Sequence, residues 1–243
     1  MFCISWLCVW KVVDEWQFLA QEALEKWHTV YVYNQFGTTK ENTKYWWPEQ
    51  IKEFILWNCT EGDNIIISGQ SYWAHESRLA LNLMEDEIKK KNLQIQLDLL
   101  VPAAAEIFWK TALNLITWTK FGIQVLLDRN KQSDYKMRYG INTFARVWSE
   151  HSKAEVSSLF KNITFDYKTR LKVALLYPPG VWELPNDIKI NIYVCDKDKA
   201  TWVKMWKIIQ KKHPNSQMHV LKGDHLILSY QDHCKKISDN WEK

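Results

Sequence analysis

Apolar positions along the chain fall into two kinds of segment that alternate. Six short runs are nearly continuous and rich in β-branched and aromatic residues, as expected for buried strands. These runs are Phe2 to Trp6, Thr29 to Tyr33, Asn64 to Ser68, Ile95 to Val101, Lys189 to Cys195 and Met218 to Leu221. Between most of them, apolar residues recur at helical spacing, for example from Trp16 to Leu24 and from Trp202 to Ile209. The alternation predicts an α/β fold, with right-handed βαβ units and a mainly parallel sheet flanked by helices.

The alternation stops between about residues 102 and 186. Only helical patterns occur in this stretch, and the segment 178–185, which holds three Pro and one Gly, marks the return to a strand. We therefore predict an α/β core formed by residues 1–101 and 187–243, with a helical lid inserted at residues 102–186.

The predicted lid carries the positive charge of the chain. Residues 102–186 hold 12 Lys or Arg against 7 Asp or Glu, a net charge of +5, whereas the remainder holds 20 against 21. A basic lid beside an active site favours an anionic substrate or an acidic partner, because opposite charge steers their encounter. The alternative is a solvated helical surface whose excess of positive charge has no partner.

Composition narrows the class of protein further. The chain has 243 residues, of which 47% are hydrophobic, so it can bury a substantial core. The five Cys are scattered without a C-x-x-C pair, which predicts neither a disulfide framework nor a metal site, and we expect no cofactor. No signal-peptide pattern opens the chain, and no apolar run reaches the roughly 18 residues of a membrane span. We expect a cytoplasmic protein with a small-molecule substrate, without a nucleic-acid partner.

A serine, Ser71, follows the third apolar run after Gly69 and Gln70. Residues 64–71 form a buried strand that runs into a turn, and a helix is predicted from Ala74 to Glu85. A serine between a strand and a helix has the geometry of a nucleophile elbow, in which the helix N-terminus helps to stabilise an oxyanion. Gly69, two residues earlier, relieves the crowding of this turn. The pattern predicts Ser71 as the nucleophile.

The last two apolar runs end in an acid and in a histidine. Asp196 and Asp198 follow the fifth run, and His225 comes four residues after the sixth. The order Ser, Asp, His at the carboxyl ends of parallel strands is typical of a hydrolase triad. His225 would take the proton of Ser71, while a carboxylate from Asp198 or Asp196 would fix its tautomer. Both acids are candidates on position alone.

Over essentially its full length the chain resembles the α/β-hydrolase superfamily. Residues 190–198 are similar to that family's strand and G-E-K-D type acid loop, which favours Asp198, and residues 222–226 are similar to its G-x-G-H-L type histidine loop. Within the superfamily the chain most resembles the biotin-pathway esterases that cleave pimeloyl-carrier-protein methyl ester. The resemblance implies a carboxylic ester hydrolase that binds an acidic acyl carrier protein through basic lid residues. The candidates for that contact are Arg129, Arg138 and Arg146.

The resemblance also implies two backbone donors for the oxyanion. One is the N–H of Tyr72, and the other is the N–H of Val9 or of its neighbour Cys8, which follow the first strand. The family has a His-Gly pair in that loop, whereas this chain has only bulky or apolar residues from position 7 to position 10.

A second departure lies in the elbow, where the family has small residues after the nucleophile. Here Trp73 stands two residues after Ser71, and a bulky indole is expected to oppose the close approach of helix and strand. With only seven Gly in the chain, both departures favour a second hypothesis. Under this hypothesis the protein has a hydrolase fold but little or no turnover. It is then either a binding protein or a redesigned sequence that keeps the fold without regard to catalysis.

Overall fold

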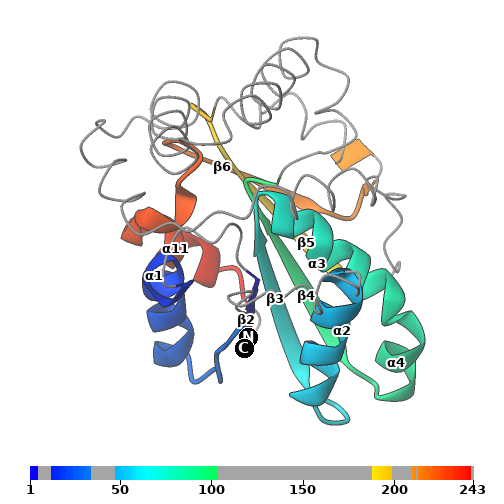
Figure 1. The fold of residues 1–243 in the computed structure, drawn as a ribbon. Helices are drawn as coiled ribbons and strands as arrows, with labels where there is room; N and C mark the ends of the chain where they lie inside the picture. The colour runs from blue at the N-terminus through cyan, green and yellow to red at the C-terminus, as the bar shows by residue number, and fades with distance from the viewer. Residues whose placement is uncertain (5–11, 34–46, 103–187, 199–209, 212, 242–243) are drawn as a thin grey trace, which may run out of the picture.

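The computed structural model describes residues 1–4, 12–33, 47–102, 188–198, 210–211 and 213–241. Within them, six strands form one sheet in the order β2-β1-β3-β4-β5-β6, and every neighbouring pair is parallel (Figure 1). The strands are β1 Phe2–Ile4, β2 Tyr31–Tyr33, β3 Asn64–Gln70, β4 Gln94–Leu100, β5 Lys189–Cys195 and β6 Gln217–Leu221. The predicted α/β class and parallel sheet are confirmed.

The strands differ from the predicted runs mainly in length. β2 begins two residues later than the apolar pattern suggests. β3 extends past Ser68 to Gln70, because Gly69 and Gln70 continue the ladder with Leu99 and Leu100 of β4. Strand pairing therefore carries the chain two residues further toward the predicted nucleophile than hydrophobicity alone indicates.

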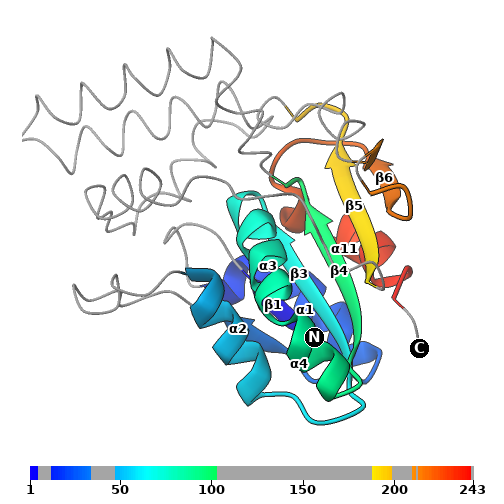
Figure 2. The ribbon, with the colours of Figure 1, turned by 90° about the vertical axis from the view of Figure 1, so that its right-hand side faces the viewer.

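Helices cover both faces of the sheet. The helices are α1 Val12–Glu25, α2 Trp47–Trp57, α3 Tyr72–Leu83, α4 Glu85–Lys90 and α11 Gln231–Ser238, with a short 3-10 helix η3 at Ile227–Ser229. Figure 2 shows α2, α3 and α4 on one side of the sheet and α1 and α11 on the other. The helix predicted from Ala74 to Glu85 begins earlier, at Tyr72, and ends at Leu83, just before α4.

Each face of the sheet has its own hydrophobic core. Alternate residues of a strand point to opposite faces, so Ile65 and Ile67 pack toward α2 and α3, while Ile66 packs toward the face of α1 and α11. Trp16 and Leu19 of α1 are fully buried on that second face. Cover on both sides explains why β3 and β5 read as continuous apolar runs rather than alternating ones.

The face of α1 and α11 also holds a buried polar group in the centre of the sheet. Asp98 of β4 accepts hydrogen bonds from Gln96 Nε2 at 3.0 Å, Asn191 Nδ2 at 3.0 Å and Trp241 Nε1 at 2.7 Å. Burial raises the pKa of the Asp98 carboxyl above its ordinary value, against the opposing effect of these three donors. The bond to Trp241 ties the end of the described chain to the middle of the sheet.

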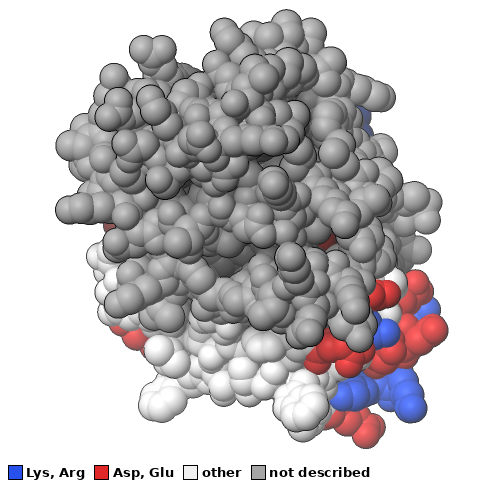
Figure 3. Space-filling model, viewed as in Figure 1, with Lys and Arg blue, Asp and Glu red and all other residues white. Residues whose placement is uncertain are grey.

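Charged side chains gather on the solvent side of α4, which buries none of its residues (Figure 3). Lys89 pairs with Glu85 at 2.7 Å along the helix, and Lys52 of α2 reaches Glu87 at 3.0 Å. Such exposed pairs contribute only about 0 to 1 kcal/mol each. α4 is therefore a solvated edge of the molecule.

The predicted lid, residues 102–186, lies outside the described residues apart from Pro102. Arg129, Arg138, Arg146 and Val9 fall outside them as well, so their roles stay predictions. Among the described helices, none combines the length and the apolar character that crossing a membrane requires.

Candidate active site

Ser71 occupies a sharp turn between the end of β3 and the start of α3. Its backbone angles are φ 53° and ψ −122°, outside the regions that residues with a Cβ favour. A strained residue of this kind costs about 1 to 3 kcal/mol and persists only where its surroundings hold it. Here the Ser71 N–H donates to Leu100 O at 2.9 Å, and the Ala74 N–H donates to Ser71 O at 3.3 Å.

This turn is the strand-to-helix geometry of a nucleophile elbow. The turn is present with Trp73 as the second residue of α3. One main-chain bond, from the Ser71 N–H to Leu100 O, joins this turn to β4. Gly69 lies in β3 and pairs with Ile4 and Leu99 on either side.

Ser71, His225 and Asp198 form a continuous line of hydrogen bonds. The Ser71 Oγ lies 2.9 Å from His225 Nε2, and His225 Nδ1 lies 2.8 Å from Asp198 Oδ2. All three are buried, with exposed fractions of 7%, 3% and 5% for Ser71, His225 and Asp198. With the proton on Nδ1 donated to Asp198, the Nε2 lone pair is left to accept the Ser71 hydroxyl proton.

The two candidate acids have different partners. Asp198 accepts from the His225 ring, whereas Asp196 Oδ1 accepts the backbone N–H of Gly223 at 2.9 Å. Asp196 is exposed, while Asp198 is buried. The acid that faces the histidine is therefore Asp198, as the family loop implies.

Further residues hold the histidine loop, and sequence reasoning did not single them out. Gln70 Nε2 lies 3.4 Å from the carbonyl oxygen of His225, and Asp224 Oδ1 accepts the N–H of Leu226 at 2.9 Å. Gly223 has φ +136°, and a Cβ there would lie 3.3 Å from Cε1 of His233. An Asp just before the histidine is a turn-forming residue, which is the pattern that could have identified Asp224.

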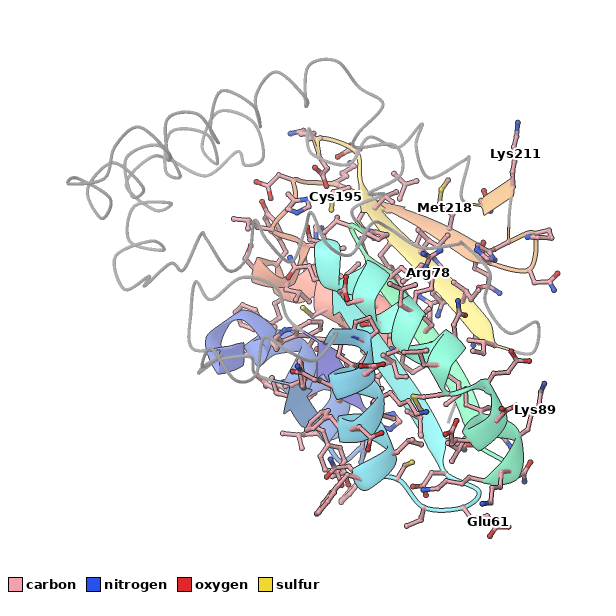
Figure 4. All side chains as sticks on the ribbon, turned by 45° about the vertical axis from the view of Figure 1, so that its right-hand side comes forward. Glu61, Arg78, Lys89, Cys195, Lys211 and Met218 are labelled. Carbon is pink, nitrogen blue, oxygen red and sulfur yellow. The ribbon has the colours of Figure 1, made fainter. Side chains whose placement is uncertain are left out.

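Cys195 lies at the carboxyl end of β5 (Figure 4). Burial, followed by the negative charges of Asp198, Asp224 and Asp196, raises the pKa of the Cys195 thiol well above its ordinary value. Of these three acids, Asp198 lies 2.8 Å from His225 Nδ1, where a carboxylate can stabilise an imidazolium during proton transfer. The site is thus suited to a serine activated by a histidine.

Tyr72 is the first residue of α3, next to Ser71. The first four N–H groups of a helix have no acceptor within it and carry the positive end of the helix dipole. The Tyr72 N–H therefore lies in a favourable position for a developing oxyanion beside Ser71. Within the described residues, no group of three His, Cys, Asp or Glu side chains could hold a metal ion.

Comparison with known proteins places this arrangement in a known fold. No protein-family model matches the sequence, and comparison with curated proteins gives no match. Solved structures do match over nearly the whole chain. An enzyme that degrades N-acyl homoserine lactones has a TM-score of 0.66 at 12% identity, covering 100% of this chain and 93% of its own.

Two further solved structures also match nearly the whole chain at low sequence identity. Polyneuridine aldehyde esterase has a TM-score of 0.63 at 13% identity, covering 98% of this chain and 97% of its own. A thioesterase domain from the curacin biosynthetic pathway has a TM-score of 0.57 at 13% identity, covering 98% and 88%. The chain therefore has the α/β-hydrolase fold.

Proposed function

We propose that the protein is a serine hydrolase that cleaves a carboxylic ester through an acyl-enzyme on Ser71. The observation that carries the proposal is the line of hydrogen bonds from Ser71 Oγ through His225 to Asp198, at 2.9 and 2.8 Å. The similar structures are named for an esterase, a thioesterase and a lactone-degrading enzyme, which supports acyl chemistry on this fold. The fold by itself leaves the substrate open.

In the proposed mechanism, Ser71 Oγ attacks the ester carbonyl while His225 Nε2 takes its proton. Asp198 holds the imidazole in the required tautomer and stabilises the imidazolium. The Tyr72 N–H, with Val9 as the predicted second donor, stabilises the oxyanion of the tetrahedral intermediate. His225 then protonates the leaving alcohol, and a water molecule activated by the same histidine releases the acid.

A serine-directed fluorophosphonate probe tests the nucleophile. The wild type is expected to be labelled, Ser71→Ala to be unlabelled and His225→Ala to be labelled far more slowly. Ser68→Ala is the matched control, because Ser68 is also fully buried in β3 but its hydroxyl has no hydrogen-bond partner among the described residues. Equal labelling of the wild type and Ser71→Ala, or no labelling of the folded wild type, would refute the proposal.

A hydrolase-fold protein with little turnover is the second candidate, favoured by the residues at positions 7–10 and by Trp73. Loss of one oxyanion donor lowers the rate about 10²- to 10³-fold in a known hydrolase. In that case the probe still labels Ser71, but hydrolysis of a panel of simple esters stays near the rate of the His225→Ala variant. Ester hydrolysis by the wild type that disappears in His225→Ala excludes this candidate.

As a finer proposal, the ester is an acyl chain held by an acidic acyl carrier protein. The support is the net charge of +5 over residues 102–186, which include Arg129, Arg138 and Arg146. The expected result is a higher kcat/KM for a carrier-bound ester than for the free ester, with the advantage falling as salt is raised. Reversing the charge of the three arginines should lower kcat/KM for the carrier-bound ester alone.

A further inference from the structure

We propose that Asp224 and Asp196 are positioning residues that hold the His225 loop in place from both sides, each by accepting a backbone N–H. The inference rests on the proposed function, because it concerns the geometry of that same site. Neither acid is needed for proton transfer in the mechanism above, which uses Asp198 alone. Their part is to fix where the imidazole stands relative to Ser71.

Asp224 acts on the downstream side of the histidine. Its Oδ1 accepts the N–H of Leu226 at 2.9 Å, so the carboxylate closes a turn that spans His225. Asp and Asn form this kind of turn with the backbone two residues further on. Asp224 is only 1% exposed, and a hydrogen bond to a buried carboxylate is stronger than a neutral one. The bond restricts the backbone angles of His225 itself.

Asp196 acts on the upstream side. Its Oδ1 accepts the N–H of Gly223 at 2.9 Å, and the carbonyl oxygen of Gly223 accepts the N–H of Lys197 at the same distance. The β5–β6 ladder ends at the pair Cys195 and Leu221, so these two bonds extend the pairing past the end of both strands. The histidine loop is thereby bonded to the loop that carries Asp198.

The consequence is that the distance between His225 Nδ1 and Asp198 Oδ2 is set by the backbone, not by side-chain rotamers alone. A fourth bond to the loop, from Gln70 Nε2 to the His225 carbonyl, is longer at 3.4 Å and therefore weaker. Removing either carboxylate takes away one of the bonds that hold the loop that carries the imidazole. A displacement of about 1 Å in a catalytic group can cost about 100-fold in rate.

Asparagine separates acceptance from charge, because its side-chain oxygen still accepts an N–H but carries no charge. Asp224→Asn is expected to keep kcat within about threefold of the wild type, whereas Asp224→Ala lowers kcat by up to about 100-fold with little change in KM. Asp196→Asn and Asp196→Ala should show the same order with a smaller loss, since Asp196 is exposed. If Asn lowers kcat as much as Ala at both positions, the positioning role is overturned.

Asp63 provides a matched control for the loss of a turn-forming carboxylate. It accepts the Thr60 N–H at 2.7 Å in the turn before β3, so it lies at the opposite end of this strand from Ser71. Asp63→Ala therefore removes the same kind of bond and should leave kcat unchanged. A loss of kcat in Asp63→Ala equal to that in Asp224→Ala would overturn the proposal, because it would assign the effect to general destabilisation.

Nuclear magnetic resonance of histidine labelled with ¹⁵N gives a readout that does not need activity. The His225 ring signals, assigned by their loss in His225→Ala, should coincide in the wild type and Asp224→Asn and should shift in Asp224→Ala. Unchanged ring signals in Asp224→Ala would refute the positioning role. If the wild type neither hydrolyses esters nor binds the serine probe, the proposed function fails, while the ring signals still decide the positioning role.

Discussion

Replacing Trp241 with Phe tests whether the buried carboxylate of Asp98 depends on a hydrogen bond from the end of the chain. Trp241 Nε1 lies 2.7 Å from Asp98 Oδ2, and Asp98 is fully buried. Phe retains an aromatic ring but cannot donate. Trp16→Phe is the matched control, because Trp16 is buried on the same face of the sheet and its Nε1 has no partner among the described residues.

The two variants lose similar ring atoms, so their difference isolates the hydrogen bond. A hydrogen bond to a charged group contributes about 1.5 to 3 kcal/mol. For a domain of this length, 1 kcal/mol shifts Tm by about 2 to 4 °C. Where Asp98 is ionised, above its folded pKa, Trp241→Phe should therefore lower Tm by about 3 to 12 °C more than Trp16→Phe does.

The destabilisation by Trp241→Phe is expected to depend on pH in a defined direction. Burial raises the pKa of Asp98 in the folded protein, so the stability that this group contributes is present below its unfolded pKa and is lost as pH rises through the folded pKa. Trp241 donates to the ionised form, and its loss raises the folded pKa further. The extra destabilisation by Trp241→Phe should thus be largest above the folded pKa of Asp98 and shrink in acid.

Urea unfolding followed by far-ultraviolet circular dichroism, from about pH 4 to about pH 8, measures both variants against the wild type. The Trp16→Phe loss should stay flat over this range. Equal losses in the two variants at every pH, or a Trp241→Phe loss that grows in acid, would show that the bond to Asp98 does not stabilise the fold.

Three further outcomes are expected. Trp27 is 96% exposed and has φ 65° just after α1, a left-handed position that favours glycine, so Trp27→Gly should raise the free energy of unfolding by about 0.5 to 1 kcal/mol in denaturant titrations. Gly223→Ala should lower it by about 1 to 3 kcal/mol, because its φ is +136° and the added Cβ meets His233; unchanged stability would contradict this strain. Burial raises the pKa of Cys234 to about 12 and that of Cys195 well above its ordinary value, so both thiols should resist alkylation by iodoacetamide at pH 8 in the folded protein, as measured by peptide mass spectrometry.

The sequence is sufficient to predict the sheet and the meeting of the three site residues, and the reason is geometric. Strands covered on both faces must be apolar throughout, which makes β3 and β5 visible as continuous runs. In a parallel sheet the carboxyl ends of the strands lie at the same end of the sheet, so a serine after β3, an acid after β5 and a histidine after β6 are brought to that end. The choice of Asp198 over Asp196 followed only from the resemblance to the family loop.

What the sequence does not show depends on contacts between distant segments. Asp98 is one polar residue in an apolar run, and only the structure brings Asn191 and Trp241 to it, from 93 and 143 residues away. The turn at Ser71 includes a main-chain bond from its N–H to Leu100 O, and no residue pattern near Ser71 indicates that bond. Residue sizes along the sequence indicate how side chains pack, but they do not indicate main-chain hydrogen bonds between distant segments.

The pairing of β4 with β5 has a consequence for how the site comes into being during folding. This seam joins Gln96–Leu100 to Lys189–Tyr193, across a long intervening segment, and it separates Ser71 on one side from Asp198 and His225 on the other. Closing so long a loop costs chain entropy before the strand contacts form and compensate for it. Pairing between strands that are distant in sequence is therefore slow. Ser71 and His225 thus come together only once the two parts of the sheet have joined. If Ser71 is the proposed nucleophile, its reactivity should appear only when folding is complete.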